Sequence, residues 1–581
     1  MSDAPFDEIH QFLSDTKWEG AEIAPLAGDA SFRRYFRLRK NAQSAMLMHA
    51  PPPHEDPAPF LHVAGWLDAN GMRAPAVIAE DAPKGWVLTE DFGDHRMREW
   101  IDQHPDDERA IYAEAIDTLV RLHRLPAGPF APYDMAVYLR EALLLVAVCW
   151  LVGAALAALP FWLWAKAGGG GETHVFSSFT ACYFEAMSGL STTGATVLGS
   201  EGQRIGDLPK GLLLWRSLTH WLGGLGIIVL FVAVLPSTGT ASKKLFQVES
   251  TADQGGVKPR VRETARVLWL IYLGLTLAAV LLMRATGAMD WFAAVNHAFS
   301  VMSTGGLSTD DASIGGFNSV SLDLITTLFM FLAGVNFVLF FHVVQGRWSV
   351  MWKDVELRVY LVLKVVVSLI IAFNIMGTSI TTTAGRVIEG SFFQSLRFAS
   401  FQTMSLQTGT GFGTADYDLW PELSVGLLMG LMFIGGCAGS TAGGLKVIRF
   451  WICAKVLYSA LERSFRPNVV RPLKVGKMLI DDELKLSSMT YMVLLGLLTG
   501  LGCFAVYLIE PASLCDFQTA FTAAMSCLCN VGPGQHGVGP TANYGWMHPA
   551  SLWVLSILMA LGRLEVFALL VLLAPRFWRG D

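Results

Sequence analysis

Four short stretches of the sequence combine hydroxyl side chains with glycine, between segments that are otherwise apolar. They read MSGLSTTG at 187–194, AFSVMSTG at 298–305, QTMSLQTG at 402–409 and MSCLCNVG at 525–532. Irregular backbone at membrane depth survives only inside protein or along a water-filled path, because lipid leaves free N–H and C=O groups unsatisfied. A ring of backbone carbonyls can replace the hydration shell of a cation, and glycine permits the dihedral angles that turn a carbonyl inward. Each stretch is therefore predicted to form one quarter of an ion selectivity filter.

The predicted filter takes three residues from each stretch, which are Thr192, Thr193 and Gly194, Ser303, Thr304 and Gly305, Gln407, Thr408 and Gly409, and Asn530, Val531 and Gly532. The threonine before each of the first three glycines either adds a hydroxyl oxygen or simply packs. The pattern fits a pore for a monovalent or a divalent cation, and the lack of carboxylates in the four stretches argues against a divalent-selecting acidic ring. One copy alone would fit a helix-packing motif or a re-entrant loop, whereas four copies in equivalent places favour a filter.

A glycine-rich stretch is predicted to form a gate below the filter. It reads IGGCAGSTAGGLK at 434–446 and stands where a span near 423–450 would cross the bilayer. Irregular backbone is tolerated there only if it lines a cavity, and a flexible polar loop across a pore is a natural gate. The predicted gate residues are Gly435, Gly436, Gly439, Ser440, Thr441, Gly443 and Gly444. Tight helix packing through glycines spaced four apart is the alternative.

Two arginines fall inside apolar segments. Arg563 lies within the last span, where a cation is costly and usually faces a cavity or a partner. We expect its charge to raise the barrier for a permeating cation, and the alternatives are pairing with Glu565 or snorkelling. Arg216 stands near the start of the second span and is expected to be an interfacial anchor.

The apolar segments that would position these residues repeat four times. With a mean hydropathy of +0.43 over 581 residues, the chain is too apolar for an ordinary soluble protein. Runs long enough to cross the roughly 30 Å bilayer core fall near 142–164, 211–235, 265–284, 320–344, 357–377, 423–450, 488–509 and 551–574. Shorter semi-apolar pieces near 174–190, 291–302, 391–406 and 517–529 lead into the four polar stretches. An even number of crossings separates neighbouring stretches, so all four open on the same side of the membrane.

These segments predict an all-α polytopic membrane protein of four parallel repeats, with eight spanning helices and four re-entrant pore helices around one pore. The predicted repeats are 138–236, 237–344, 345–480 and 481–581, with the gating loop at 435–444 in the third. No metal-ligand spacing links the eight cysteines, which we interpret as free thiols, and no cofactor is expected in the chain.

Basic residues predict the orientation. The loop 237–266 and the segment after Gly444 are rich in Lys and Arg and should be cytoplasmic. The segments after the polar stretches carry Asp310, Asp311, Asp416, Asp418 and Glu422, so the filter is expected to face outward beneath an acidic mouth, although each of these acids could also be an ordinary loop residue. Residues 1–15 show no signal-peptide pattern, so both termini are expected in the cytoplasm.

From about residue 140 to its end the chain resembles the Trk/Ktr superfamily of potassium transporters, and within it the Trk-type membrane subunit. The resemblance rests on LSTTGATVL, WRSLTHWLGGLGIIVL, MSTGGLST, MFLAGVNFVLFF, QTGTGFGT, GGCAGSTAGGLK, NVGPG and GRLEVF, in that order. It implies K⁺ passage through one pore per chain, with one filter glycine per repeat at Gly194, Gly305, Gly409 and Gly532. It further implies a gating loop at 435–444, an arginine below the filter at Arg563, a homodimer, and a cytosolic nucleotide-binding regulatory subunit.

Residues 1–137 resemble the first part of an aminoglycoside-phosphotransferase-like sugar kinase. LAGDASFRRYFRL at 26–38 looks like the strands that cover ATP phosphates, WVLTEDFGD at 86–94 like the hinge, and residues 108–125 like the following helix. The catalytic Asp, the downstream Asn and the metal-binding Asp of such kinases do not follow, because the chain enters the apolar segment near 142. Phosphoryl transfer is therefore not expected. Trk-type subunits usually carry two additional membrane helices where this α+β segment stands.

The sequence thus predicts a K⁺ uptake protein of the bacterial cytoplasmic membrane, and not an enzyme or a nucleic-acid-binding protein. A membrane-tethered sugar kinase-like protein and a Na⁺-coupled secondary transporter are the alternatives. The second would favour inverted repeats and ionisable residues at the midplane, which the four parallel stretches do not provide.

Overall fold

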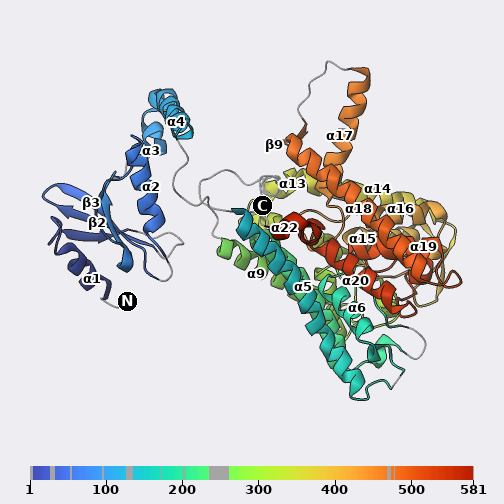
Figure 1. The fold of residues 1–581 in the computed structure, drawn as a ribbon. Coiled ribbons are helices and arrows are strands. Elements are labelled where there is room, and N and C mark those ends of the chain that lie inside the picture. Colours follow the sequence, from blue (N-terminus) through green and yellow to red (C-terminus); the bar gives the residue numbers. More distant parts are fainter. Residues whose placement is uncertain are drawn as a thin grey trace. The chain divides into compact units, whose positions relative to one another are not determined.

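The computed structural model describes residues 4–26, 33–52, 55–93, 97–125, 135–171, 173–199, 203–233, 261–466, 473–476 and 478–579. The chain divides into two compact units, Met1–Met135 and Ala136–Asp581. Figure 1 shows the elements of each unit. Most of the basic loop predicted at 237–266, and the Ala27–Phe32 part of the kinase-like motif, lie outside the described residues.

The first unit is built on a five-stranded antiparallel sheet in the order β1-β2-β3-β5-β4. Its elements are α1 Ala4–Leu13, β1 Glu22–Pro25, β2 Arg34–Lys40, β3 Gln43–His49, α2 Ala58–Ala69, β4 Val77–Asp81, β5 Trp86–Glu90, α3 Met97–Gln103 and α4 Glu108–His123. Alternate residues of β2 point inward, as expected for a sheet with one buried face. Leu38, Leu47 and Leu88 from three neighbouring strands are fully buried against Ile9 of α1.

The second unit is helical, and each of the eight predicted spans falls on one or two helices. These are α5 Met135–Lys166, α7 Lys210–Ala233, α9 Val261–Ala285, α11 Val320–Ala333 with α12 Phe337–Val344, α14 Val355–Asn374, α16 Glu422–Phe433 with α17 Val447–Phe465, α18 Asp482–Ile509, and α20 Pro549–Arg563 with α21 Phe567–Leu570. Within the described residues, three single helices are long and apolar enough to cross a membrane, or up to five spans if each bent pair counts as one. The chain is therefore a membrane protein by composition, with fewer uninterrupted spans than the eight predicted.

Three predicted spans are broken. The pair α11 and α12 bends by 95°, and the Asn336 side chain accepts a hydrogen bond from the N–H of Val338 at the start of α12. The pair α20 and α21 bends by 114°, and Glu565 and Val566 take φ angles of 54° and 61° at the bend. Helix α16 stops at Phe433, and thirteen non-helical residues, which we call the intramembrane loop (434–446), precede α17. Hydropathy alone does not detect these breaks, because the residues at them are still mostly small or apolar.

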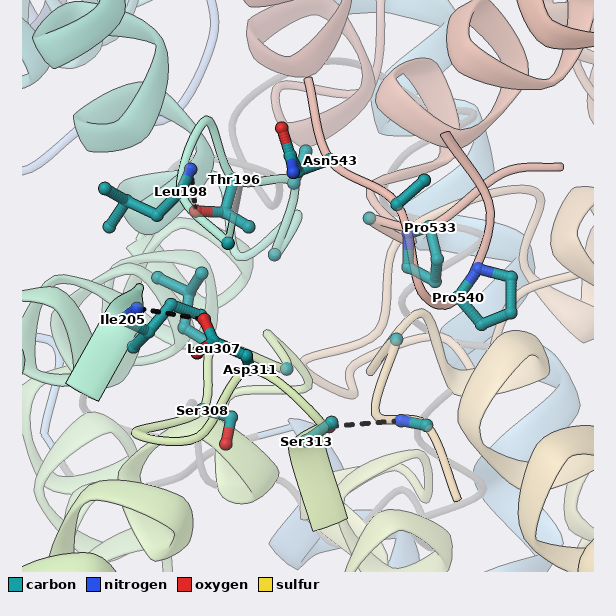
Figure 2. Close-up of a pocket in the computed structure, with 18 of the residues that line it drawn as sticks. Thr196, Leu198, Ile205, Leu307, Ser308, Asp311, Ser313, Pro533, Pro540 and Asn543 are labelled. Atoms are coloured by element: carbon teal, nitrogen blue, oxygen red, sulfur yellow. Dashed lines mark hydrogen bonds between the residues drawn. The ribbon is translucent and has the colours of Figure 1, made fainter. Parts of the chain in front are cut away.

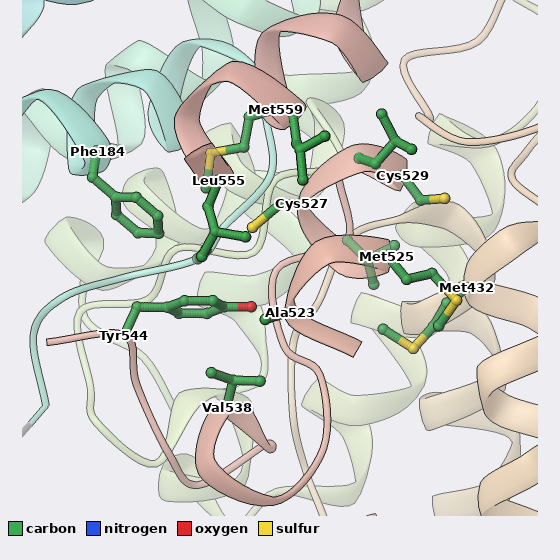
Figure 3. Packing of buried hydrophobic residues seen from close by; sticks show 14 of the residues in the cluster. Phe184, Met432, Ala523, Met525, Cys527, Cys529, Val538, Tyr544, Leu555 and Met559 are labelled. Carbon is green, nitrogen blue, oxygen red and sulfur yellow. The ribbon is translucent and has the colours of Figure 1, made fainter. Parts of the chain in front are cut away.

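Four shorter helices precede the polar stretches and match the predicted semi-apolar pieces closely. They are α6 Phe179–Leu190, α10 Trp291–Met302, α15 Phe392–Thr408 and α19 Phe517–Cys529. Three of them begin with a side-chain cap, from Asp290, Ser391 or Asp516, which satisfies an N–H of the first turn. Figure 3 shows how α19 packs, with Cys527 and Met525 among Tyr544, Leu555 and Met432 from other segments. Most residues of all four helices are buried within the protein.

The remaining elements are short. They are two hairpins, β6 Ser379–Thr381 with β7 Val387–Glu389 and β8 Lys474–Val475 with β9 Met478–Leu479, helices α13 Trp348–Lys353 and α22 Pro575–Arg579, and 3-10 turns at Ala82–Lys84, Pro105–Asp107, Val175–Ser177, Ile205–Asp207, Ser313–Phe317, Tyr417–Leu419, His536–Val538 and Val571–Leu573. The hairpins were not predicted. All eight cysteines are free.

Candidate functional site

The four polar stretches form turns with the same backbone geometry. In each, an N–H donates to the carbonyl of a serine five residues earlier, at 2.8–2.9 Å. The donors are Thr193, Gly305, Thr410 and Val531, and the acceptors are Ser188, Ser300, Ser405 and Ser526. The next residue in each turn is a glycine with positive φ, at 83° for Gly194, 78° for Gly306, 75° for Gly411 and 101° for Gly532. These four glycines are therefore the equivalent positions.

This geometry corrects the predicted register of the second and third turns. Gly305 stands one residue before the glycine equivalent to Gly194, and Gly409 stands two residues before it. Helix α15 continues to Thr408, and Gly409, with φ of 73°, takes the left-handed position that Thr192, Thr304 and Asn530 take in their own turns, with φ of 54°, 57° and 55°. Thr408 and Gln407 thus belong to the helix and not to the turn proper.

The four turns contact one another in a closed cycle. A Cβ atom added to the equivalent glycine of each turn would meet the backbone carbonyl oxygen of the next turn. The contacts run from Gly194 to Gly305, from Gly306 to Thr410, from Gly411 to Val531, and from Gly532 back to Thr193, where the distance would be 2.6 Å. Only a residue without a side chain fits such a close approach. The turns therefore surround one common axis, in chain order.

A pocket opens directly on this cycle. Gly194, Gly306, Gly411 and Gly532 all line it, together with the segments that follow each turn, and Figure 2 shows these segments converging. Asp310 and Asp311 are also in its lining, and Asp311 Oδ1 accepts a hydrogen bond from the N–H of Ile205 at 2.9 Å. The pocket thus presents backbone and carboxylate oxygens to whatever enters it.

The other predicted mouth acids lie elsewhere. Asp416, Asp418 and Glu422 are not among the described residues that line this pocket. Asp418 instead accepts a hydrogen bond from the N–H of His536 at 2.9 Å. Burial, with the neighbouring Asp416 charge adding to it, raises the pKa of Asp418 to about 6. The charge of this loop therefore changes around pH 6.

Polar side chains of the turns bond mainly to the protein. Asn530 Nδ2 donates to Thr193 Oγ1 and to the carbonyl of Met559, both at 3.0 Å, and so joins the first turn, the fourth turn and α20. Thr304 Oγ1 donates to the carbonyl of Ser303, and Thr408 Oγ1 bonds within α15 and to Thr410. The hydroxyl of Thr192, by contrast, has no described hydrogen-bond partner.

A buried ion pair supports the first turn from behind. Arg216 is 1% exposed, and its guanidinium contacts Glu185 Oε1 of α6 at 2.8 Å and the carbonyl of Ser308 at 3.1 Å. Glu185 also accepts hydrogen bonds from Thr196 Oγ1 and from the N–H of Val197, just beyond the first turn. The prediction that Arg216 is an interfacial anchor is wrong, because its charge is paired and enclosed. The pair links segments of the first and second turns.

Replacing Arg216 by alanine is expected to destabilise the protein by about 3–5 kcal/mol, because Glu185 would remain as a buried charge without its partner. Thermal unfolding in detergent checks this, with Arg204→Ala, at an exposed position, as the control. Equal unfolding temperatures for the two variants would contradict the role given to the pair.

The intramembrane loop is closed at its base and folded into the protein. The N–H of Gly435 donates to the carbonyl of Leu445 at 2.8 Å, and the N–H of Val447 donates to the carbonyl of Gly436 at 3.1 Å. The N–H of Cys437 donates to the carbonyl of Gly334, and the N–H of Phe337 donates to the carbonyl of Gly439. The loop is thus seated on the break between α11 and α12. The stretch is not helical, so the alternative of helix packing through its glycines does not apply.

The tip of the intramembrane loop reaches the turns. Thr441 Oγ1 donates to the carbonyl of Met302, the last residue of α10, at 3.1 Å. A Cβ atom on Gly443 would overlap the carbonyl oxygen of Cys529, the last residue of α19. The loop therefore touches the base of the second and of the fourth turn.

Arg563 also contacts the tip of the intramembrane loop. It is 2% exposed, and its Nη1 donates to the carbonyl of Thr441 at 2.8 Å while Nη2 donates to the carbonyl of Gly223 at 3.0 Å. Glu565 pairs instead with Arg449 of α17, at 2.7 Å. The alternative in which Arg563 pairs with Glu565 is therefore not realised. The guanidinium lies beside the loop with two carbonyl partners and no described carboxylate.

Comparison with known proteins identifies the family. Residues 134–579 match the TrkH family model, described as cation transport protein. The chain is 36% identical to the Trk system potassium uptake protein TrkH of Salmonella typhimurium over 453 residues, covering 76% of this chain and 86% of that protein. This chain belongs to the TrkH family. TrkH of Escherichia coli, at 36% identity, has the same coverage. The crystal structure of the potassium transporter TrkH from Vibrio parahaemolyticus matches with a TM-score of 0.65 and 33% identity, over 81% of this chain and 91% of that one.

The N-terminal part of this TrkH family member has a second likeness. Residues 22–167 match the phosphotransferase enzyme family model APH. The match extends beyond the predicted boundary at 137 and overlaps the TrkH match, whereas the compact unit ends at Met135. Helix α4 Glu108–His123 falls on the helix predicted at 108–125, and β2 Arg34–Lys40 overlaps the strand motif at 26–38, whereas β1 ends before that motif and the predicted hinge at 86–94 begins with strand β5.

Several site residues escaped the sequence analysis. Gly306, Thr410 and Gly411 complete the cycle of turns, and Glu185 partners Arg216. The sequence does contain a pattern that predicts Gly306, Thr410 and Gly411, because each turn has a serine six residues before its equivalent glycine. No comparable signal marks Glu185.

Proposed function

We propose that this chain takes up K⁺ across the bacterial cytoplasmic membrane, through a filter of backbone carbonyls formed by the four turns. The relatives from Salmonella typhimurium and Escherichia coli are named as potassium uptake proteins, which supports the choice of ion. The closed cycle of four equivalent turns is the observation that carries the proposal, because it surrounds one axis with backbone oxygens at a pocket.

The proposed filter consists of the last residues of the four turns. Three residues of each turn would supply its carbonyls. They are Thr192, Thr193 and Gly194 in the first turn, Thr304, Gly305 and Gly306 in the second, Gly409, Thr410 and Gly411 in the third, and Asn530, Val531 and Gly532 in the fourth. Ser303, Gln407 and Thr408, which the sequence analysis placed in the filter, are left to support it from the helix ends. The wider fold proposed is four parallel repeats of span, pore helix, turn and span around this axis.

The intramembrane loop and Arg563 are the proposed barrier on the inner side of the filter. The loop is an irregular and largely buried segment that contacts the base of two turns, and this position supports its role as a gate. The proposed gate residues are Gly435, Gly436, Gly439, Ser440, Thr441, Gly443 and Gly444. The guanidinium of Arg563 would repel a cation leaving the filter. Opening would require the loop tip to leave Met302 and Arg563.

The proposed assembly and location follow the Trk family. We propose a homodimer in the bacterial inner membrane with both termini in the cytoplasm, regulated by a cytosolic nucleotide-binding Trk subunit. The mean hydropathy of the chain and its apolar helices support a membrane location.

Phosphoryl transfer by the first unit is the second candidate activity, and the match of residues 22–167 to the phosphotransferase model favours it. We propose that this unit is catalytically silent. The chain enters the apolar helix α5 shortly after α4, so the second kinase lobe with its catalytic Asp, Asn and metal-binding Asp has no place in the sequence. ATP-dependent phosphorylation of a sugar by the purified chain would overturn this.

Complementation tests the proposed function. The chain is expected to restore growth at low K⁺ to a bacterium that lacks its own K⁺ uptake systems and keeps a cytosolic Trk subunit. Removing residues 2–137 is expected to change growth little, because the second unit is compact without them. Failure of the full chain to support growth, with the protein present in the membrane, would count against K⁺ uptake.

A further inference from the structure

A buried carboxyl group contacts the intramembrane loop and is not one of the proposed filter residues. Glu356 lies in the first turn of α14 and is 6% exposed. Its Oε1 accepts a hydrogen bond from the N–H of Ala438 at 2.9 Å and another from the N–H of Ile448 at 2.9 Å. Ala438 belongs to the intramembrane loop, whereas Ile448 belongs to the first turn of α17. One oxygen atom therefore joins the loop to the helix that follows it.

This contact depends on the loop being in its present position. A buried polar group is costly unless hydrogen bonds replace the water that it has lost, and this holds for the carboxyl group of Glu356 and for the N–H of Ala438 alike. Ile448 belongs to α17, whereas Ala438 belongs to the loop. Ala438 would leave the carboxyl group if the loop moved away from the break between α11 and α12. The carboxyl group would then lose one of its two described donors.

Resting on the proposed function, we propose that Glu356 is the positioning residue that holds the gate closed. Other described contacts also hold the loop, among them the bond from Cys437 to Gly334, that from Thr441 to Met302, and the bonds of Arg563 and Lys446 to loop carbonyls. Glu356 differs from these because one side-chain oxygen serves two buried N–H groups, which would both lose this acceptor if the side chain were removed. Glu356 therefore biases the loop toward the closed state.

Rb⁺ uptake into proteoliposomes that contain the purified full chain, without a regulatory subunit, tests this inference. Glu356→Ala removes the acceptor and is expected to raise the uptake rate on the order of tenfold, because in the closed state the buried N–H of Ala438 loses its acceptor. Glu356→Gln keeps an amide oxygen in the same place and should give a smaller rise. The preference for K⁺ over Na⁺ should stay at the value of the unsubstituted chain, which we call the parent, in both variants, because neither substitution changes the filter.

Matched controls separate gating from general destabilisation. Glu483→Ala removes an exposed carboxylate from the first turn of α18 and should leave uptake at the parent rate. A rise in uptake with unchanged ion preference is not what a merely unstable protein gives, since loss of folded chain lowers uptake. Uptake at or below the parent rate in both Glu356 variants, with an active parent, would overturn the inference alone. Absence of Rb⁺ uptake from every chain, the parent included, would overturn the proposed function as well.

Discussion

Replacing Gly194 by alanine is expected to reduce K⁺ uptake at least about tenfold, because the structure has no place for the added methyl group. The Cβ atom would overlap the carbonyl oxygen of Gly305 in the next turn, and the φ of 83° at Gly194 is one that alanine adopts only with strain. Relief of this clash has to displace the carbonyl oxygen of Gly305, which belongs to the proposed filter. Initial rates of K⁺ uptake in proteoliposomes or in the complemented bacterium measure the effect.

Gly426→Ala is the matched control for this substitution. Gly426 lies within α16, where an added Cβ atom meets nothing within 4 Å and alanine favours the helix. The control is expected to keep the parent rate. Full uptake by Gly194→Ala, at equal amounts of protein, would mean that the close approach of the first two turns is not needed for conduction.

Replacing Arg563 by glutamine is expected to raise K⁺ uptake by about 1.5 to 3 orders of magnitude. At an effective dielectric constant of about 20, a unit charge a few ångströms from the ion repels it by roughly 2–4 kcal/mol, and each 1.4 kcal/mol is a factor of ten. Glutamine also makes at most one of the two carbonyl contacts, to Thr441 or to Gly223, that the guanidinium makes. Removal of the charge and release of the loop act in the same direction.

Arg563→Lys separates the two effects. Lysine keeps the positive charge but cannot reproduce the planar fork that reaches two carbonyls. If repulsion dominates, this variant should remain close to the parent rate while Arg563→Gln conducts faster. Uptake by Arg563→Gln at or below the parent rate, with the variant folded in the membrane, would contradict the barrier role.

The short helices could be predicted closely from the sequence. Semi-apolar runs near 291–302 and 517–529 coincide with α10 Trp291–Met302 and α19 Phe517–Cys529. Such runs are too short to cross a bilayer, and a following polar stretch must be enclosed by protein, so length and polarity together define them. The break within the span near 423–450 was predicted from its glycines, whereas the breaks at Gly334 and Val566 were not, because these residues differ little in hydropathy from the helices around them.

The register of two turns could not be read from glycine spacing alone. The second and third stretches each end at a glycine and have another shortly after it, Gly305 followed by Gly306 and Gly409 followed by Gly411, and the choice between them depends on where the helix before the turn ends. Helix ends are set by capping and packing, which the stretch itself does not specify. Aligning the stretches by Ser188 and its counterparts, rather than by the first glycine, gives the observed register.

The supporting contacts depend on tertiary structure. Arg216 and Glu185 are 31 residues apart in the sequence, and Glu356 is 82 residues from Ala438. No local pattern joins such residues, and a single charge in an apolar segment fits an interfacial anchor equally well. Only the packing of α6 against α7, and of α14 near the intramembrane loop, brings the partners together.

The central claim is that four equivalent turns form one cation site on a common axis. Crystals of the purified chain soaked with Tl⁺, a K⁺ mimic with strong anomalous scattering, test it most directly. We predict anomalous density on the axis, within coordination distance of the carbonyl oxygens of Thr193, Gly305, Thr410 and Val531. Tl⁺ bound elsewhere in the second unit, with the axis between the four turns empty, would contradict the claim.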